Sequence, residues 1–187
     1  MKKNIVFLFA IQLLILYSCR SHCDGFPDRY LKWIPYQMND KIKYVNNHDT
    51  IILSVIDYFK TEPFSPRTVL PFVVCDPSQG YYQTTNDHGY SIREEFEEGY
   101  NRMQILITDK EKFTFNILNK SSYSDSIKVK YSADTTINLA DYQEVFLISK
   151  DTISKSPQIA WIIKAKDKGI VEFYNYRTKQ KWDLVAD

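Results

Sequence analysis

Short stretches in which apolar and polar residues alternate recur along most of the chain. Residues 41–45 alternate, residues 46–49 have the composition of a turn, and residues 50–60 form a long extended run, which together predict a β-hairpin. Residues 102–108 and 112–118 flank a short polar segment and predict a second hairpin. Further strands are predicted at residues 68–75, 127–131, 142–149, 159–165, 169–174 and 181–185.

The last two of these runs predict a closing hairpin, because residues 175–180 between them are long enough to form its loop. Side chains alternate between the two faces of a strand. Those predicted to face the core are Val171, Phe173, Trp182 and Leu184, and those predicted to point to water are Glu172 and Asp183.

Residues 91–99 fit two kinds of structure. Ser91 and Glu94 have the spacing of a capping box, and Ile92, Phe96 and Tyr100 recur every four residues, as on one face of a helix. The same residues also alternate with a period of two, as in a strand. A short helix and a charged edge strand are therefore both compatible with the pattern.

The fold class follows from these runs and from the composition. No stretch after the N-terminal segment shows sustained helical periodicity, and the fourteen tyrosines and eleven phenylalanines suit pleated, half-buried surfaces. We therefore expect a mostly β fold, a single antiparallel β-sandwich or partly closed barrel of about 8–10 strands.

The N-terminal segment has the pattern of a secretory signal. Lys2 and Lys3 precede an apolar run at residues 5–16 that only Gln12 interrupts, and the small residue Ser18 comes before Cys19. The run is too short to cross a hydrocarbon core as a helix, which takes roughly 20 residues. The segment is therefore predicted to be cleaved off rather than to span a membrane.

The end of this signal, Leu16-Tyr17-Ser18-Cys19, resembles the lipobox of bacterial lipoproteins, although Tyr17 stands where a small residue is commoner. The resemblance implies that the Cys19 thiol receives diacylglycerol, that the chain is cut before Cys19, and that fatty acyl chains such as palmitate then hold it in a membrane. Several chains on one cysteine make a stable anchor, since each buried CH₂ contributes about 0.8 kcal/mol. This predicts a signal peptide at 1–18, a lipidated tether at 19–28 and a β domain at 29–187.

Arg20 follows the lipidated cysteine, where an aspartate would resemble an inner-membrane retention signal, and this favours the outer membrane of a Gram-negative cell. Arg20-Ser21-His22 lacks the acidic cluster that marks surface display in some lineages, so we favour the periplasmic face over the cell surface. Trp33-Ile34-Pro35-Tyr36 and residues 169–184 are similar to the two ends of small, uncharacterised lipoproteins of Gram-negative anaerobes. That similarity implies no activity.

The charge of the chain excludes one class of partner. It has 24 basic and 23 acidic residues, and Lys2 and Lys3 leave with the signal. A nearly neutral domain has no strong field to draw it to nucleic acid or to an anionic lipid surface. The predicted partners are therefore the membrane, through the lipid on Cys19, and a protein or a glycan, with no nucleic acid.

The sequence contains no recognisable catalytic or cofactor motif. His22, His48 and His88 form no metal-spaced group with one another or with cysteine. A G-x-S-x-G nucleophile, a Walker loop and a dinucleotide glycine fingerprint are all missing from the sequence, which has five glycines in total. We therefore expect no enzyme, no catalytic residue, no metal and no cofactor.

The densest carboxylate group is formed by Glu94, Glu95, Glu97 and Glu98. Paired carboxylates can perform acid–base hydrolysis or hold Ca²⁺, but the run lacks the alternating Asp, Asn and Gly of a calcium loop. We interpret it as a solvated face or a protected sheet edge.

Lipidation of Cys19 leaves Cys23 and Cys75, an even number of thiols in an oxidising compartment. A disulfide between them would join the tether to the run that ends at Cys75. Two reduced thiols, one of them buried as a small hydrophobe, are the alternative.

Four tyrosines gather in the irregular middle of the chain, Tyr81, Tyr82, Tyr90 and Tyr100. Aromatic side chains among small polar residues often form surfaces that bind proteins or glycans, although each can instead pack along a strand with its hydroxyl in water. We therefore expect a membrane-anchored, non-enzymatic binding or envelope-assembly module. The alternatives are a carrier of lipid or another hydrophobic ligand in a β cavity and a carboxylate-dependent hydrolase.

Overall fold

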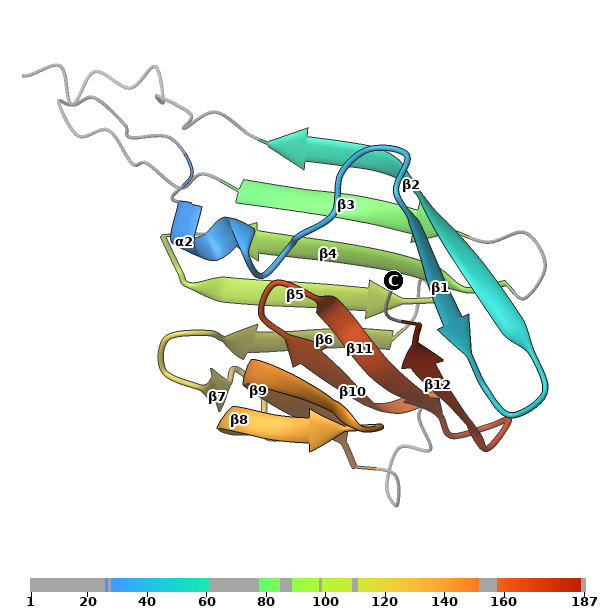
Figure 1. Ribbon diagram of the computed structural model, residues 1–187. Coiled ribbons are helices and arrows are strands. Elements are labelled where there is room, and N and C mark those ends of the chain that lie inside the picture. The colour runs from blue at the N-terminus through green and yellow to red at the C-terminus, as the bar shows by residue number, and fades with distance from the viewer. Residues whose placement is uncertain are drawn as a thin grey trace, which may run out of the picture.

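The computed structural model describes residues 26, 28–60, 78–84, 89–97, 99–108, 111–151 and 158–185, and for residues 78–84 it describes only the backbone and Gly80. This part of the chain is almost entirely β (Figure 1). The predicted fold class is confirmed, because the strands are antiparallel and form a sandwich-like arrangement that does not close into a barrel.

The helix and strands of the described residues come in one order along the chain. They are α2 (Asp28–Leu31), β1 (Lys41–Val45), β2 (Thr50–Lys60), β3 (Ser78–Thr84), β4 (Ser91–Glu97), β5 (Arg102–Ile107), β6 (Glu111–Asn116), β7 (Ser121–Ser122), β8 (Ile127–Ile137), β9 (Ala140–Lys150), β10 (Ile159–Ala165), β11 (Gly169–Asn175) and β12 (Gln180–Leu184).

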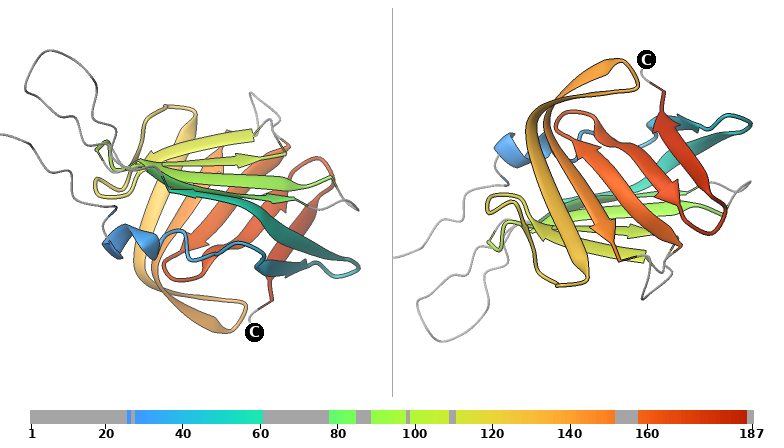
Figure 2. Two further views of the ribbon diagram at one scale, coloured as in Figure 1. Left: turned by 90° about the horizontal axis from the view of Figure 1, so that it is seen from above. Right: turned by 90° about the horizontal axis from the view of Figure 1, so that it is seen from below.

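The strands form one hydrogen-bonded series in the order β7-β6-β5-β4-β3-β2-β1-β12-β11-β10-β9-β8. The series folds over on itself into two facing layers, β1 to β7 in one and β8 to β12 in the other (Figures 1 and 2). The layers are joined where β1 pairs with β12, through Tyr44 opposite Leu184 and Val45 opposite Asp183. The two ends of the series, β7 and β8, leave the sandwich open on the other side.

The described residues contain twelve strands, more than expected from the sequence. The run Ser-Gln-Gly-Tyr-Tyr-Gln-Thr of β3 has no apolar alternation and was not expected to be a strand. The strand predicted at residues 68–75 lies outside the described residues. Within the ambiguous segment 91–99, Ser91–Glu97 form a strand, β4. The idea of an edge strand is wrong, because β4 lies between β3 and β5.

The core lies between the two layers and follows the period-two rule. In β5, for example, Met103, Ile105 and Ile107 are fully buried and alternate with half-buried residues. Aromatic rings meet across the layers, with the centroids of Phe115 on β6 and Phe146 on β9 5.1 Å apart.

The segment that contains α2 packs into this core. Phe26 meets the ring of Phe96 on β4 edge-on at 5.8 Å, and Trp33 lies 5.1 Å from Phe146 on β9. The chain is therefore attached to both layers before β1 begins. Among the described residues, the core already includes Phe26, which lies within the predicted tether of residues 19–28.

The predicted closing hairpin consists of β11 and β12, and its core positions Phe173 and Trp182 are opposite each other and fully buried. The prediction that Glu172 points to water is wrong, because Glu172 is buried. Val171 is also buried, but not beside Phe173. An irregularity in the pairing of β10 and β11 leaves Val171 without a register partner and places it in a second small cluster with Val145 and Ala165.

This second cluster is covered by the end of the β8–β9 hairpin, which we call the arm. Glu144 has a φ of 49°, and beyond it β9 no longer pairs with β10. The arm turns there and bends over the outside of the β10–β12 layer (Figure 2). At its tip, Asn138 donates hydrogen bonds to Asp183 at 2.8 Å and to Glu172 at 3.2 Å.

Candidate functional site

The four tyrosines predicted to form a binding surface do not all lie at the surface. Tyr81 and Tyr82 are on β3, opposite Glu94 and Arg93 of β4, and their side chains lie outside the described part. Tyr90 is in the core, so its assignment to an exposed surface is wrong.

Tyr90 is buried because two aromatic side chains of the closing hairpin surround its ring. Its centroid is 5.5 Å from that of Phe173 and 5.7 Å from that of Trp182. Its hydroxyl accepts a hydrogen bond from Asn175 at 2.9 Å, which satisfies the polar atom away from water. Tyr100, by contrast, is 57% exposed and is the one predicted tyrosine whose described side chain lies at the surface.

The three cysteines lie outside the described residues, so lipidation of Cys19 and a bond between Cys23 and Cys75 stay predictions. In the described residues, no helix has the length and apolar character needed to cross a membrane. Within the same residues, no three His, Cys, Asp or Glu side chains are close enough to hold a metal ion.

The predicted acidic group is divided between the two faces of β4. Glu94 points into the core and is fully buried, where it pairs with Lys164 of β10, so the interpretation of the group as a solvated face is wrong for this residue. Glu95 and Glu97 point to the other side of the sheet. Glu98 lies outside the described residues.

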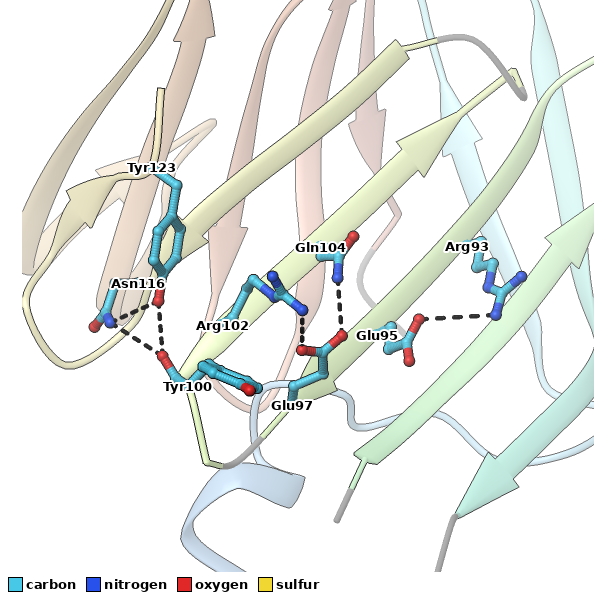
Figure 3. Close-up of polar contacts among 8 residues, drawn as sticks. All are labelled: Arg93, Glu95, Glu97, Tyr100, Arg102, Gln104, Asn116 and Tyr123. Atoms are coloured by element: carbon cyan, nitrogen blue, oxygen red, sulfur yellow. Dashed lines mark hydrogen bonds and ion pairs between the residues drawn. The ribbon is translucent and has the colours of Figure 1, made fainter. Parts of the chain in front are cut away.

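An array of solvent-facing polar side chains lies beside Tyr100 on the outside of this layer. We call it the outer face. It consists of Arg93, Glu95, Glu97, Arg102 and Gln104, which Figure 3 shows, together with Leu106 and Lys112. Strand alternation places these positions together, because their neighbours in the sequence face the core. No described helix or strand lies against the outside of β3 to β6 (Figure 2).

Glu97 organises one half of the outer face. Arg102, directly opposite on β5, forms an ion pair with one carboxylate oxygen, and the amide of Gln104 donates to the other oxygen at 3.0 Å. The guanidinium of Arg102 also lies over the ring of Tyr100, 5.2 Å from its centroid. Charged, amide and aromatic groups are therefore held in one fixed arrangement at this end (Figure 3).

Arg93 organises the other half. Its guanidinium lies 3.7 Å from the carboxylate of Glu95 and 5.5 Å from the ring centroid of Phe59 on β2. Phe59 can lie on the sheet because the residue beside it is Gly80. A Cβ at this position would overlap the Phe59 ring and the backbone oxygen of Glu94.

A shallow hollow of about 240 Å³ opens on the outer face between β4, β5 and β6. Its lining includes Arg93, Glu95, Gln104, Leu106 and Lys112. The hollow is open and of mixed polarity, which suits recognition of part of a larger polar molecule better than enclosure of a small apolar one.

A second, wider hollow of about 680 Å³ lies between β1 and the arm. It is lined by Tyr36, Lys41 and Lys43 on one side and by Asp141 and Tyr142 of the arm on the other. Tyr36 donates its hydroxyl proton to the backbone oxygen of Lys168 at 2.6 Å. Burial raises the pKa of the Tyr142 hydroxyl, with Asp183 and Glu172 adding to the effect, so this phenol stays protonated.

Sequence reasoning missed Arg93, Arg102 and Gln104 as surface-forming residues. The signal was present in the period-two pattern of β4, where Arg93, Glu95 and Glu97 occupy alternate positions. This pattern identifies the three residues as one surface only if the segment is a strand rather than a helix.

No family model, no curated protein and no solved structure matches this chain. Its function is therefore argued from its own residues and geometry.

Proposed function

We propose that this chain is a lipoprotein anchored by lipid on Cys19 in the outer membrane, with its domain on the periplasmic side. The domain is a non-enzymatic binding or envelope-assembly module, and the outer face is its contact surface for a protein or a glycan. The anchor is supported by the Leu16-Tyr17-Ser18-Cys19 pattern. The observation that carries the binding role is the ordered, solvent-facing array around Glu97 and Arg93 (Figure 3).

The outer face contains two arginines, Arg93 and Arg102, and each lies over an aromatic ring, Phe59 and Tyr100, respectively. Arginine and tyrosine are enriched at protein interfaces and are the residues that most often dominate binding energy. Arg93 and Arg102 are held by carboxylates and by aromatic rings, so they lose less conformational freedom when a partner binds than freely rotating side chains would.

The two alternatives have less support in the described residues. A carrier of lipid needs a ligand-sized apolar cavity, whereas the described space between the layers is filled by fully buried side chains such as Phe113, Phe115 and Phe146. A carboxylate-dependent hydrolase needs two carboxyl groups in one cleft. Glu94 is paired inside the core, and Glu95 and Glu97 are each bound to an arginine on the opposite face.

The anchor is tested by metabolic labelling with a radioactive or clickable fatty acid. We expect the parent chain to be labelled and the Cys19→Ala variant to be unlabelled and to accumulate unprocessed or soluble. A Cys23→Ala variant is the matched control and should keep the label. Undiminished label on Cys19→Ala would contradict the anchor.

The contact surface is tested in intact cells with the photo-crosslinker benzoylphenylalanine in place of Gln104 in the full lipidated chain. Ser149, half-buried like Gln104 but on the outside of the opposite layer, is the matched control position. We expect adducts from position 104 and none from position 149. Digestion of the adducts with a protease or with peptidoglycan hydrolases then identifies the partner as protein or glycan, and equal adducts from both positions would contradict the proposed surface.

A further inference from the structure

The chain enters the domain at one end of the sandwich, and that end is fixed by several contacts. Phe26 packs edge-on against Phe96 at 5.8 Å and against Tyr30 at 6.2 Å. The hydroxyl of Tyr30 donates to the side-chain oxygen of Asn101 in the β4–β5 turn at 2.8 Å. The backbone oxygen of Asn101 accepts from the amide of Ile117, at the start of the β6–β7 turn, at 3.0 Å. The segment that contains Phe26 and Tyr30 therefore lies together with the β4–β5 and β6–β7 turns at one end of the domain (Figure 1).

This end exposes apolar and aromatic side chains. Among the described residues, seven large hydrophobic side chains are exposed, and three of them, Tyr100, Leu118 and Tyr123, belong to this end. They are 57%, 56% and 51% exposed, respectively. We call these three residues the end patch.

The end patch is held rigidly. The hydroxyl of Tyr123 donates to the backbone oxygen of Tyr100 at 2.7 Å, and the amide of Asn116 donates to the same oxygen at 3.2 Å and to the Tyr123 hydroxyl at 2.9 Å (Figure 3). The side-chain oxygen of Asn116 accepts from the backbone amide of Asn119 at 2.7 Å, which fixes the turn that carries Leu118. Exposure of these side chains is therefore not a consequence of a loose loop.

The length of the tether places this end close to the membrane. Only seven residue steps separate Cys19 from Phe26, and an extended chain covers at most about 25 Å in that distance. The headgroup layer alone takes roughly 5–7 Å on each side of a bilayer. A domain lipidated at Cys19 must therefore keep the end that holds Phe26 within a short distance of the headgroups.

We propose that the end patch rests in the headgroup region of the membrane as a second contact beside the lipid on Cys19; this inference rests on the proposed lipid anchor. Tyrosine is enriched at membrane interfaces, where the ring meets the acyl chains and the hydroxyl stays hydrated. Arg29 and Lys120 lie on the same end, over the rings of Tyr30 and Tyr131, respectively, and can contact lipid phosphates.

This contact also sets the orientation of the outer face. Strands β4, β5 and β6 all have one terminus at the end patch and run away from it (Figure 1). With the patch on the headgroups, the outer face extends away from the membrane instead of lying on it. Arg93, Glu95 and Gln104 are then accessible to a periplasmic partner.

The test uses the full lipidated chain in vesicles of phosphatidylethanolamine and phosphatidylglycerol, with and without dibrominated phosphatidylcholine as a short-range fluorescence quencher. Leu118→Trp places a fluorophore in the end patch at a side chain for which no hydrogen bond has to be broken. Ile52→Trp is the matched control, because Ile52 is 50% exposed but lies next to the β1–β2 turn, at the far end of the sandwich (Figure 1). Emission of the parent protein in the same vesicles is subtracted from both.

We expect flotation of both variants with the vesicles, strong quenching of the added emission in Leu118→Trp, and none in Ile52→Trp. If both variants float and Leu118→Trp is quenched no more strongly than Ile52→Trp, the end patch is not the specific membrane contact, while the lipid anchor stands. A Leu118→Trp emission shifted to the blue without quenching would show that a protein, a glycan or a second copy covers the patch, which also overturns the inference. Failure of both variants to float would overturn the anchor and this inference together.

Discussion

Glu94 of β4 and Lys164 of β10, 70 residues apart in the sequence, form an ion pair between the two layers of the sandwich. Both side chains are completely shielded from solvent. Burial lowers the pKa of the Lys164 ammonium, and the Glu94 carboxylate opposes this effect. Tyr44 is close to the pair, and its pKa is raised well above the ordinary value by burial and then by Glu94, while its hydroxyl donates to the backbone oxygen of Ile170 at 2.9 Å.

We expect loss of either partner of this pair to be severely destabilising. Glu94→Gln or Lys164→Met leaves one buried charge without its partner, which typically costs about 3–5 kcal/mol. The double variant Glu94→Leu/Lys164→Met should recover most of that loss, because an apolar pair needs no compensation for desolvation. Urea denaturation of the lipidated chain in detergent micelles measures all three variants.

The neighbouring pair on the outer face provides the control. Arg93 and Glu95 are 3.7 Å apart, with side chains 52% and 25% exposed. Glu95→Gln should therefore change the free energy of unfolding by less than about 1 kcal/mol. If Glu94→Gln costs no more than Glu95→Gln, the buried pair does not contribute to the stability of the fold.

The alternation of apolar and polar residues was sufficient to predict the fold class and most strands, because it reports which face of a strand is buried. It could not predict where each strand lies in the sheet. Residues 91–97 have enough charge for an edge strand, and the ion pair with Lys164 on β10 helps to accommodate Glu94 in the centre. A contact between residues so distant in sequence leaves no local signal.

The candidate site was predictable only in part, for two further physical reasons. A tyrosine has the same local pattern whether its ring is exposed or buried, and Tyr90 is buried because Phe173 and Trp182 come from the other layer. A single irregularity in strand pairing also changes which face a residue occupies, as for Val171. Tyr100 is exposed because it lies in the β4–β5 turn, and its role in a binding surface stays a prediction.

The tip of the arm contains strain that a substitution should relieve. Asn138 and Leu139 form the two-residue turn between β8 and β9, with φ of 50° and 68°. Left-handed backbone costs roughly 1–2 kcal/mol for residues other than glycine, and Leu139 is 99% exposed, so its side chain recovers little of this by packing. We expect Leu139→Gly to stabilise the protein by about 1 kcal/mol, measured as a shift of the urea midpoint.

Asn138→Gly is the control for this prediction. It relieves the backbone less, because asparagine tolerates the left-handed region better than leucine, and it removes the hydrogen bonds from the Asn138 amide to Asp183 and Glu172. Its gain should therefore be smaller than that of Leu139→Gly, or become a loss. A larger gain from Asn138→Gly would mean that the contacts of the arm tip do not stabilise the fold.

Glu172, beneath the arm tip, should make stability depend on pH. Burial raises the pKa of its carboxyl, the hydrogen bond with Asp183 adds to this, and Lys181 at 3.3 Å opposes it. Because the folded protein holds this proton more tightly than the unfolded chain, the stabilising contribution is complete below the ordinary glutamate pKa of about 4.3. The contribution is lost as pH rises from there through the raised folded value.

Glu172→Gln should remove the loss of stability with rising pH, because the glutamine amide cannot ionise. Its oxygen still accepts a hydrogen bond from Asn138. We expect the free energy of unfolding of Glu172→Gln, relative to the parent, to increase between about pH 4 and pH 7. Urea denaturation at several pH values measures the difference. Leu139→Gly, which changes the same turn but no side chain that binds Glu172, should shift the whole profile with little change of its slope. A difference between Glu172→Gln and the parent that stays constant or falls with pH would show that Lys181 and Asn138 keep this carboxylate ionised at no cost to the fold.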